Sequence, residues 1–134
     1  MKSRHYFFPQ LTGPDALTLA QAPIDKPGVG NVLVRLHAAS LNCRDLVIAE
    51  GRSRAPVADR LIPLSDAVGE VVEIGERVTH WKSGDRVMGN FMQAWINGEL
   101  PLNGSASVLG GGGGGSRAQT PRLGRSRDAA NARR

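Results

Sequence analysis

Cysteine is nearly absent from this chain of 134 residues, and long hydrophobic runs are absent altogether. The single thiol, Cys43, excludes an intramolecular disulfide and any zinc cluster built from several cysteines, and it suits a reducing cytosol. No apolar run approaches the ~18–20 residues that a helix needs to cross a bilayer. The basic start, Met1–His5, is followed by an apolar stretch too short for a signal peptide. We therefore expect a cytoplasmic protein with no membrane partner.

Aromatic residues are missing beyond residue 100, and Asp128 is the one acidic residue there. Residues 1–100 carry 11 Lys+Arg and 11 Asp+Glu, whereas residues 101–134 carry six Arg and the glycine run Gly110–Gly115. The formal net charge of +5 therefore lies in the tail, and it is no argument for a nucleic-acid partner of the body. We expect one small domain over 1–100 and a disordered Gly/Arg-rich tail over 101–134.

Short apolar stretches separated by turn residues run through the body. The pattern predicts strands over 4–8, 17–22, 32–39, 67–75 and 86–91, and a short helix over 42–50 that stops at Gly51. In the third strand Val32, Val34, Leu36 and Ala38 are expected on the buried face. Gly69 indicates a bend or a close backbone approach inside the fourth. The predicted fold class is mainly β: a partly open barrel with one or two short helices and no second domain.

Three stretches together resemble a known family. They are Leu64–Gly75 (LSDAVGEVVEIG), Val78–Val87 (VTHWKSGDRV) and, upstream, Val32–Asp45 (VLVRLHAASLNCRD). Over residues 4–100 the chain resembles the N-terminal, GroES-like catalytic domain of the medium-chain dehydrogenase/reductase superfamily. Within it the chain is most similar to the zinc-independent, quinone-oxidoreductase-like branch. The resemblance implies an NADP or NAD cofactor, a small-molecule quinone, enone or carbonyl substrate, and often a homo-oligomer.

Zinc binding is not expected. The zinc-dependent relatives place a ligating Cys where this chain has Asn42, and a ligating His with an adjacent Glu where it has Ser65 and Asp66. Zinc prefers thiolate, imidazole and carboxylate ligands, so Asn and Ser are poor replacements. One cysteine also cannot form the four-cysteine lobe of those relatives. The chain therefore carries no expected metal ligand.

The resemblance places the candidate site around residues 42–45 and 65–66. The candidate catalytic residues are Asn42, Cys43, Asp45, Ser65 and Asp66, and Arg44 is the candidate for binding a cofactor phosphate. Without a metal, negative charge on a substrate oxygen must be met by hydrogen-bond donors. The amide of Asn42 can donate without ionising and is the first choice for that task.

Each of the remaining candidates also suits a simpler structural role. Cys43 stands where zinc-free relatives often carry Tyr, and it equally suits a small, half-buried apolar position. Asp45 either orients the cleft or caps its helix, and Arg44 is either a cofactor ligand or an ion-paired surface residue. Ser65 and Asp66 also suit turn residues bonded to nearby backbone.

The cofactor domain of such enzymes has no counterpart in the tail. A dinucleotide-binding unit needs a glycine-rich turn between a strand and a helix, and Gly110–Gly115 lacks both neighbours. The tail arginines resemble GC-rich DNA translated out of frame, so we expect a truncated or frameshifted oxidoreductase fragment that is inactive alone. Two alternatives stay open. They are nucleic-acid or anionic-surface binding through the tail, and a stand-alone GroES-like interaction module.

Overall fold

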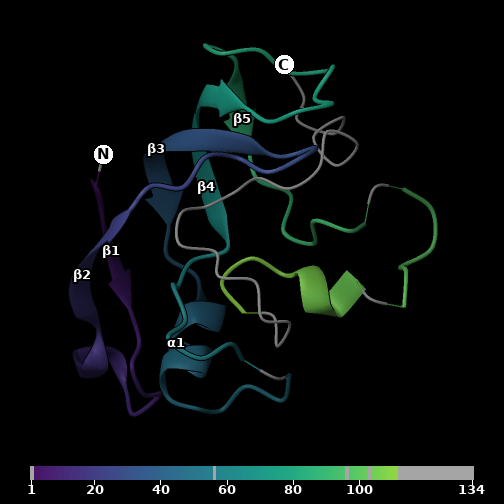
Figure 1. The fold of residues 1–134 in the computed structure, drawn as a ribbon. Helices are drawn as coiled ribbons and strands as arrows, with labels where there is room; N and C mark the ends of the chain where they lie inside the picture. The colour runs from purple at the N-terminus through teal and green to yellow at the C-terminus, as the bar shows by residue number, and fades with distance from the viewer. Residues whose placement is uncertain (1, 56, 96, 103, 112–134) are drawn as a thin grey trace.

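The computed structural model describes residues 2–55, 57–95, 97–102 and 104–111. Two open antiparallel sheets form its framework (Figure 1). Strands β1 (Lys2–Phe7) and β2 (Thr18–Pro23) form the first sheet, and β3 (Val32–Ser40), β4 (Asp66–Ile74) and β5 (Arg86–Met88) form the second in the order β3-β4-β5. The helices are α1 (Cys43–Ala49) and two 3-10 turns, η1 (Pro14–Ala16) and η2 (Gly104–Ser107). The mainly β fold class is thus confirmed.

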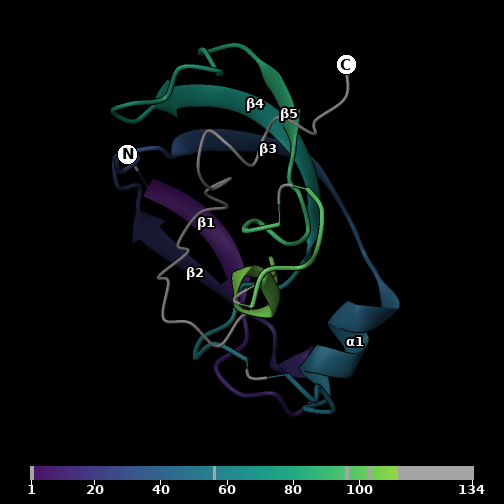
Figure 2. The same cartoon turned by 90° about the vertical axis from the view of Figure 1, so that its right-hand side faces the viewer.

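The helix α1 lies at one end of the molecule, beside the ends of both sheets (Figures 1 and 2). It follows β3 directly, and the two predicted limits of the helix are confirmed. Asn42 takes an extended conformation as N-cap, and Gly51 has a φ of 68°, a left-handed conformation that glycine adopts without strain. The predicted strands are also present, although β5 ends at Met88 rather than at residue 91.

The core of the second sheet is built from valines. Val32, Val34, Val71 and Val87 pack together, and Trp81 covers this cluster from the turn before β5. Val34 and Val71 are opposite one another in the β3–β4 ladder, and both are almost completely inaccessible to water. These β-branched side chains fit the pleated, buried surface on which the two strands meet.

The alternation predicted for β3 is wrong in its second half. Val32, Leu33 and Val34 are buried in succession, whereas Leu36 is 39% exposed and Ala38 is exposed as well. The ladder to β4 shifts register twice, between Leu33 and Val34 and between Leu36 and Ala38. Because an irregularity of this kind inserts an unpaired residue, it breaks the strict inside–outside alternation of a regular strand.

The close approach predicted at Gly69 is confirmed. Gly69 pairs with Leu36 in β3 and with Val87 in β5, so it lies in the middle of the sheet. A β-carbon built on it would lie 2.7 Å from Cγ1 of Val34 and closer still to the carbonyl oxygen of Arg35. Only a residue without a side chain allows the two strands to come this near.

Residues just beyond 100 fold back onto the body. Val108 forms an isolated bridge with Met92, and the N–H of Leu109 donates to the carbonyl of Phe91 at 3.0 Å. Gly104 in η2 is buried against Leu100. The domain boundary at residue 100 stays a prediction. Of the tail expected to be disordered over 101–134, residues 112–134 lie outside the described residues, and the described part makes the contacts above.

Candidate functional site

The site begins at the N-terminus of α1, where the side chain of Asp45 accepts a hydrogen bond from the backbone of Asn42. The N–H of Asn42 donates to Oδ2 of Asp45 at 2.8 Å, and the N–H of Asp45 donates to the carbonyl of Asn42 at 2.9 Å. A carboxylate at the third helical position that accepts from the N-cap backbone is one half of a capping box. Asp45 therefore caps the helix, as one of its two expected roles required, and this contact orients Asn42.

Asn42 and Asp66 meet across the ends of two strands. Ser40 at the end of β3 pairs with Asp66 at the start of β4, which brings Asn42 beside Asp66 although 24 residues separate them in sequence. Nδ2 of Asn42 donates to Oδ2 of Asp66 at 2.6 Å. Both residues are exposed, so a molecule in solution can approach the pair. The contact also settles which end of the Asn42 amide faces Asp66.

Arg44, in the first turn of α1, contacts residues near the end of the described chain. Its Nη1 donates to the carbonyls of Leu109 at 3.3 Å and Gly110 at 2.9 Å, and its Cζ lies 5.1 Å from the centre of the Phe91 ring. Partial burial lowers the pKa of Arg44 below its ordinary value, and the nearby carboxylates of Asp45 and Asp66 act in the opposite direction. Contact with a cofactor phosphate stays a prediction.

The remaining candidates lie on either side of these contacts. Cys43 is exposed at the first position of α1 and carries a free thiol, so the expected half-buried position is wrong. Ser65 is only 3% exposed, and Leu64 before it has a φ of 78°, a left-handed conformation rare outside glycine. Oδ1 of Asp45 is buried and has no hydrogen-bond partner among the described residues. Catalytic roles for Cys43, Asp45 and Ser65 stay predictions.

Sequence reasoning missed the residues that hold Arg44. Leu109 precedes the glycine run and Gly110 begins it, so both resemble part of the tail. Phe91 resembles the end of a strand. No local pattern connects these residues to a position 65 residues earlier in the chain. The only available signal was that the family-like pattern continues as far as Leu109 and Gly110.

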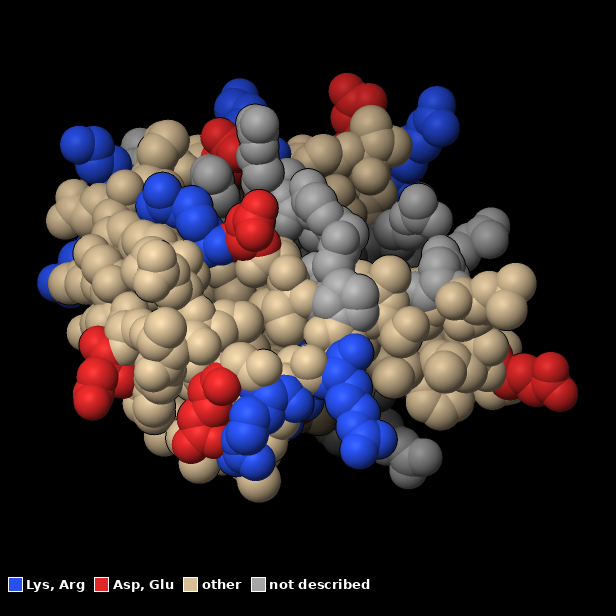
Figure 3. Space-filling view, turned by 90° about the horizontal axis from the view of Figure 1, so that it is seen from below, with Lys and Arg blue, Asp and Glu red and all other residues tan. Residues whose placement is uncertain are grey.

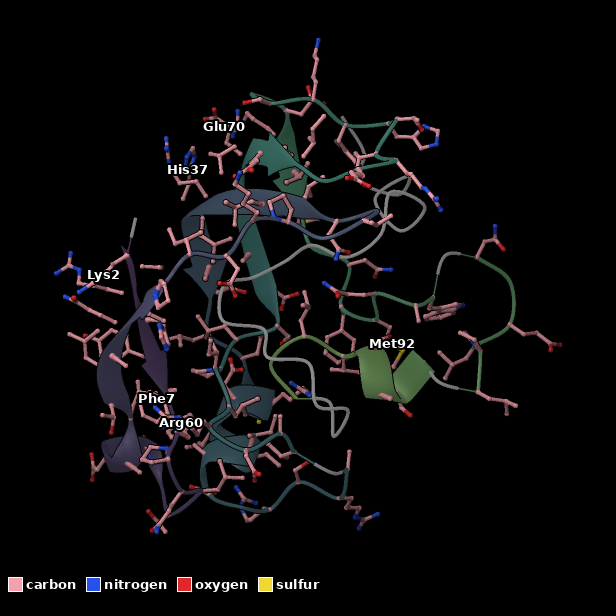
Figure 4. The ribbon with its side chains drawn as sticks, viewed as in Figure 1. Lys2, Phe7, His37, Arg60, Glu70 and Met92 are labelled. Atoms are coloured by element: carbon pink, nitrogen blue, oxygen red, sulfur yellow. The ribbon has the colours of Figure 1, made fainter. Side chains whose placement is uncertain are left out.

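Charged side chains of one sign do not form a continuous patch on the face in Figure 3. On the face in Figure 3, acidic and basic residues are interspersed around a largely uncharged surface. His37 and Glu70 lie together on the second sheet, with Nε2 and Oε2 4.0 Å apart, away from Arg60 and Phe7 near the other end (Figure 4). In the part of the chain that the structure describes, no three His, Cys, Asp or Glu side chains converge as metal ligands would. None of its helices is both long and apolar enough to span a membrane.

Known sequences identify the class to which this antiparallel, mainly β domain belongs. Residues 28–124 match the alcohol dehydrogenase GroES-like domain family, and the chain belongs to that family. A zinc-type alcohol dehydrogenase-like protein of Schizosaccharomyces pombe is 35% identical over 112 residues, which is 83% of this chain and 32% of the relative. A chloroplastic quinone-oxidoreductase of Triphysaria versicolor is 41% identical over 57% of this chain and 24% of its own length.

Solved structures give the same result. A protein of Sinorhizobium meliloti 1021 assigned as an alcohol dehydrogenase superposes with a TM-score of 0.73 at 32% identity, over 82% of this chain and 33% of that one. The quinone oxidoreductase of Escherichia coli, solved with NADPH, superposes with a TM-score of 0.60 at 26% identity, over 65% and 26%. The chain thus spans about a third or less of the length of these relatives, at their GroES-like part. Zinc independence stays a prediction, since one relative is named as zinc-type.

Proposed function

We propose that this chain is the substrate-handling part of an NAD(P)H-dependent, zinc-independent oxidoreductase that acts on quinones, enones or carbonyls in the cytoplasm. The observation that carries the proposal is the hydrogen bond between Asn42 and Asp66. It joins two exposed polar residues. Asn42 stands where zinc-dependent relatives have a ligating Cys, and Asp66 stands where they have the Glu that follows a ligating His. Support also comes from relatives named as quinone oxidoreductases and alcohol dehydrogenases.

The chain's own share of the chemistry concerns the substrate oxygen. Asn42 has two amide N–H groups, and one of them donates to Asp66. The second remains to donate to an oxygen on which negative charge develops as hydride arrives from the nicotinamide. One well-placed donor of this kind is typically worth ~10²–10³ in rate. Asp66 acts by holding the amide in that orientation.

The described residues do not by themselves fit a dinucleotide. Their five strands pair only antiparallel, so the described segments contain no βαβ unit of the type that holds NAD(P) in dehydrogenases. We therefore expect the isolated chain to leave NADPH fluorescence unchanged on mixing. Quenching with saturation at micromolar chain would contradict this expectation.

The function is testable by supplying the missing part. Residues 2–111 would be joined to the portion of the Escherichia coli quinone oxidoreductase that the superposition does not cover, and NADPH oxidation would be followed with a quinone acceptor. Asn42→Ala is expected to lower kcat by ~10²–10³, because the only change at the substrate oxygen is a lost donor. Asn42→Asp keeps the size of the side chain, removes the donor and sets a second carboxylate against Asp66, so it should lose at least as much.

A matched control is available next to the site. Leu41 is 86% exposed and makes none of the site contacts described, so Leu41→Ala should leave turnover unchanged. The proposal fails if the folded parent fusion does not oxidise NADPH in the presence of a quinone. It also fails if Asn42→Ala stays within about threefold of the parent in kcat and in kcat/KM.

A further inference from the structure

The segment Leu109–Gly111 is enclosed by two parts of the candidate site. On one side Arg44 of α1 donates to the carbonyls of Leu109 and Gly110. On the other side Gly110 lies against the backbone of Leu64: a β-carbon on Gly110 would be 2.7 Å from the carbonyl carbon of Leu64 and closer still to its oxygen. The φ of Gly110 is 61°, a left-handed conformation that favours glycine. Both this backbone conformation and the close approach to Leu64 therefore require glycine here.

Gly111 lies against the guanidinium of Arg44 and leaves room for it. A β-carbon on Gly111 would lie 3.4 Å from Cζ of Arg44 and would overlap its Nη2. The guanidinium also lies over the ring of Phe91. The backbone carbonyl of Phe91 in turn accepts a hydrogen bond from the N–H of Leu109. Arg44 is thus surrounded by two carbonyl oxygens, an aromatic ring and a residue that has no side chain to obstruct it.

These contacts close a circuit around the Asn42–Asp66 pair. Arg44 follows Asn42 by two residues, in the first turn of α1. Its guanidinium donates to the carbonyl of Gly110, and Gly110 packs against the backbone of Leu64. Two residues further along stands Asp66, which accepts from Asn42. We propose that Arg44 is a positioning residue. By docking Leu109–Gly111 between α1 and Leu64, it keeps the side chains of Asn42 and Asp66 at hydrogen-bonding distance from each other.

Arginine suits this task better than lysine would. Its planar guanidinium donates from Nη1 to both carbonyls while its Cζ lies over the Phe91 ring, and it sheds water more easily than a compact ammonium. Partial burial makes an unpartnered cation costly, so the carbonyls are needed to offset the lost hydration. The role differs from contact with a cofactor phosphate, because the Nη1 donor is already engaged within the chain. The inference rests on the proposed function for the catalytic use of the Asn42–Asp66 pair. The positioning of that pair by Arg44 does not depend on it.

A double-mutant cycle on the full chain tests the docking. Arg44→Ala should raise the unfolding equilibrium constant by ~10- to 100-fold, because charge-assisted hydrogen bonds are lost. Gly111→Ala should cost about tenfold in the parent, since the guanidinium must withdraw, and less than about twofold when Arg44 is already Ala. Gly30→Ala is the matched control. Gly30 also has a positive φ, 74°, but a β-carbon there would meet no atom within 4 Å and it makes no contact with Arg44, so its cost should be equal in both backgrounds.

Spectroscopy separates positioning from a merely structural effect. In ¹⁵N-labelled full chain, the side-chain amide of Asn42 should show a downfield N–H resonance because of Asp66, and Arg44→Ala should move it to the random-coil position while the rest of the β-sheet spectrum is retained. Arg44→Lys keeps the charge and should restore less than half of that shift. An Asn42 resonance unchanged in Arg44→Ala, or fully restored in Arg44→Lys, would overturn the proposal.

A measurement on the unaltered chain covers the case in which a variant does not fold. Arg44 should give separate, slowly exchanging Nη resonances at low temperature, because its guanidinium is fixed by two carbonyls. A single averaged resonance would overturn the inference. Neither cofactor nor substrate enters these experiments, so an inactive fusion protein would not change their outcome, and the two proposals fail independently.

Discussion

Substituting Gly69 tests how closely β3 and β4 must approach. Gly69→Ala would place a methyl group 2.7 Å from Cγ1 of Val34 and 3.0 Å from the carbonyl carbon of Arg35. Carbon atoms normally stay about 3.5–4.0 Å apart, so the strands would have to separate by roughly 1 Å. Overpacking costs about 1–3 kcal/mol and a lost ladder hydrogen bond about 1 kcal/mol, so the expected loss is ~2–4 kcal/mol. A domain of this size has about 5–15 kcal/mol in total.

The assay is urea unfolding followed by the fluorescence of Trp81, which packs on the valine core. With m of ~2 kcal/mol/M, the transition midpoint should fall by ~1–2 M while m stays constant. Gly28→Ala is the control, because a β-carbon there would meet only Nδ2 of Asn31 at an ordinary 3.5 Å. A Gly69→Ala protein within about 0.5 kcal/mol of the parent would refute the close approach. So would an equal loss in both variants.

Three further predictions use the same unfolding assay or a simple chemical one. Val71→Ala, at a fully buried position, should cost ~2–3 kcal/mol, whereas Val29→Ala, at a side chain 57% exposed, should cost under about 0.5; equal costs would contradict the assigned core. Phe91→Leu should cost about 0.5–2 kcal/mol more in the parent than in Arg44→Ala, because the ring contact needs the guanidinium; strictly additive costs would contradict that contact. Cys43 should react with a disulfide reagent at the same rate with and without mild urea, because its thiol is already exposed; a rate that climbs with urea would argue for burial.

Local signals accounted for the parts of the fold that were predicted well. The start of α1 at Asn42 and its end at Gly51 depend on capping chemistry within a few residues, and such chemistry is visible in the sequence. The close approach at Gly69 was also predicted, because glycine weakens a β-branched strand and is favoured there mainly where the backbone bends or needs space. Asn42 and Asp66 were both singled out by their place in the family motif, although their direct hydrogen bond was not foreseen.

Contacts between distant segments accounted for the rest. The exposure of Leu36 depends on irregular pairing with β4, which no feature of the 32–39 stretch reveals. The docking of Leu109 and Gly110 on Arg44 crosses 65 residues, and their glycine-rich surroundings resemble a linker. In both cases the deciding partner lies elsewhere in the chain, so periodicity and turn chemistry could not supply it.

The pairing of Ser40 with Asp66 makes the site insensitive to the length of the connection between α1 and β4. Asn42 follows β3 by two residues and Asp66 begins β4, so the strand ladder brings the two residues together and the docking at Arg44 fixes their hydrogen bond. Neither of these contacts depends on the number of residues that join α1 to β4. Residues 53–59 in that connection should therefore accept insertions or deletions at small entropic cost, with the polar pair intact. A slip of the ladder by a single residue would instead bring Ala67 to the place of Asp66 and remove the acceptor. Variation among relatives of this chain is accordingly expected to accumulate as length changes in the connection and to spare the ladder.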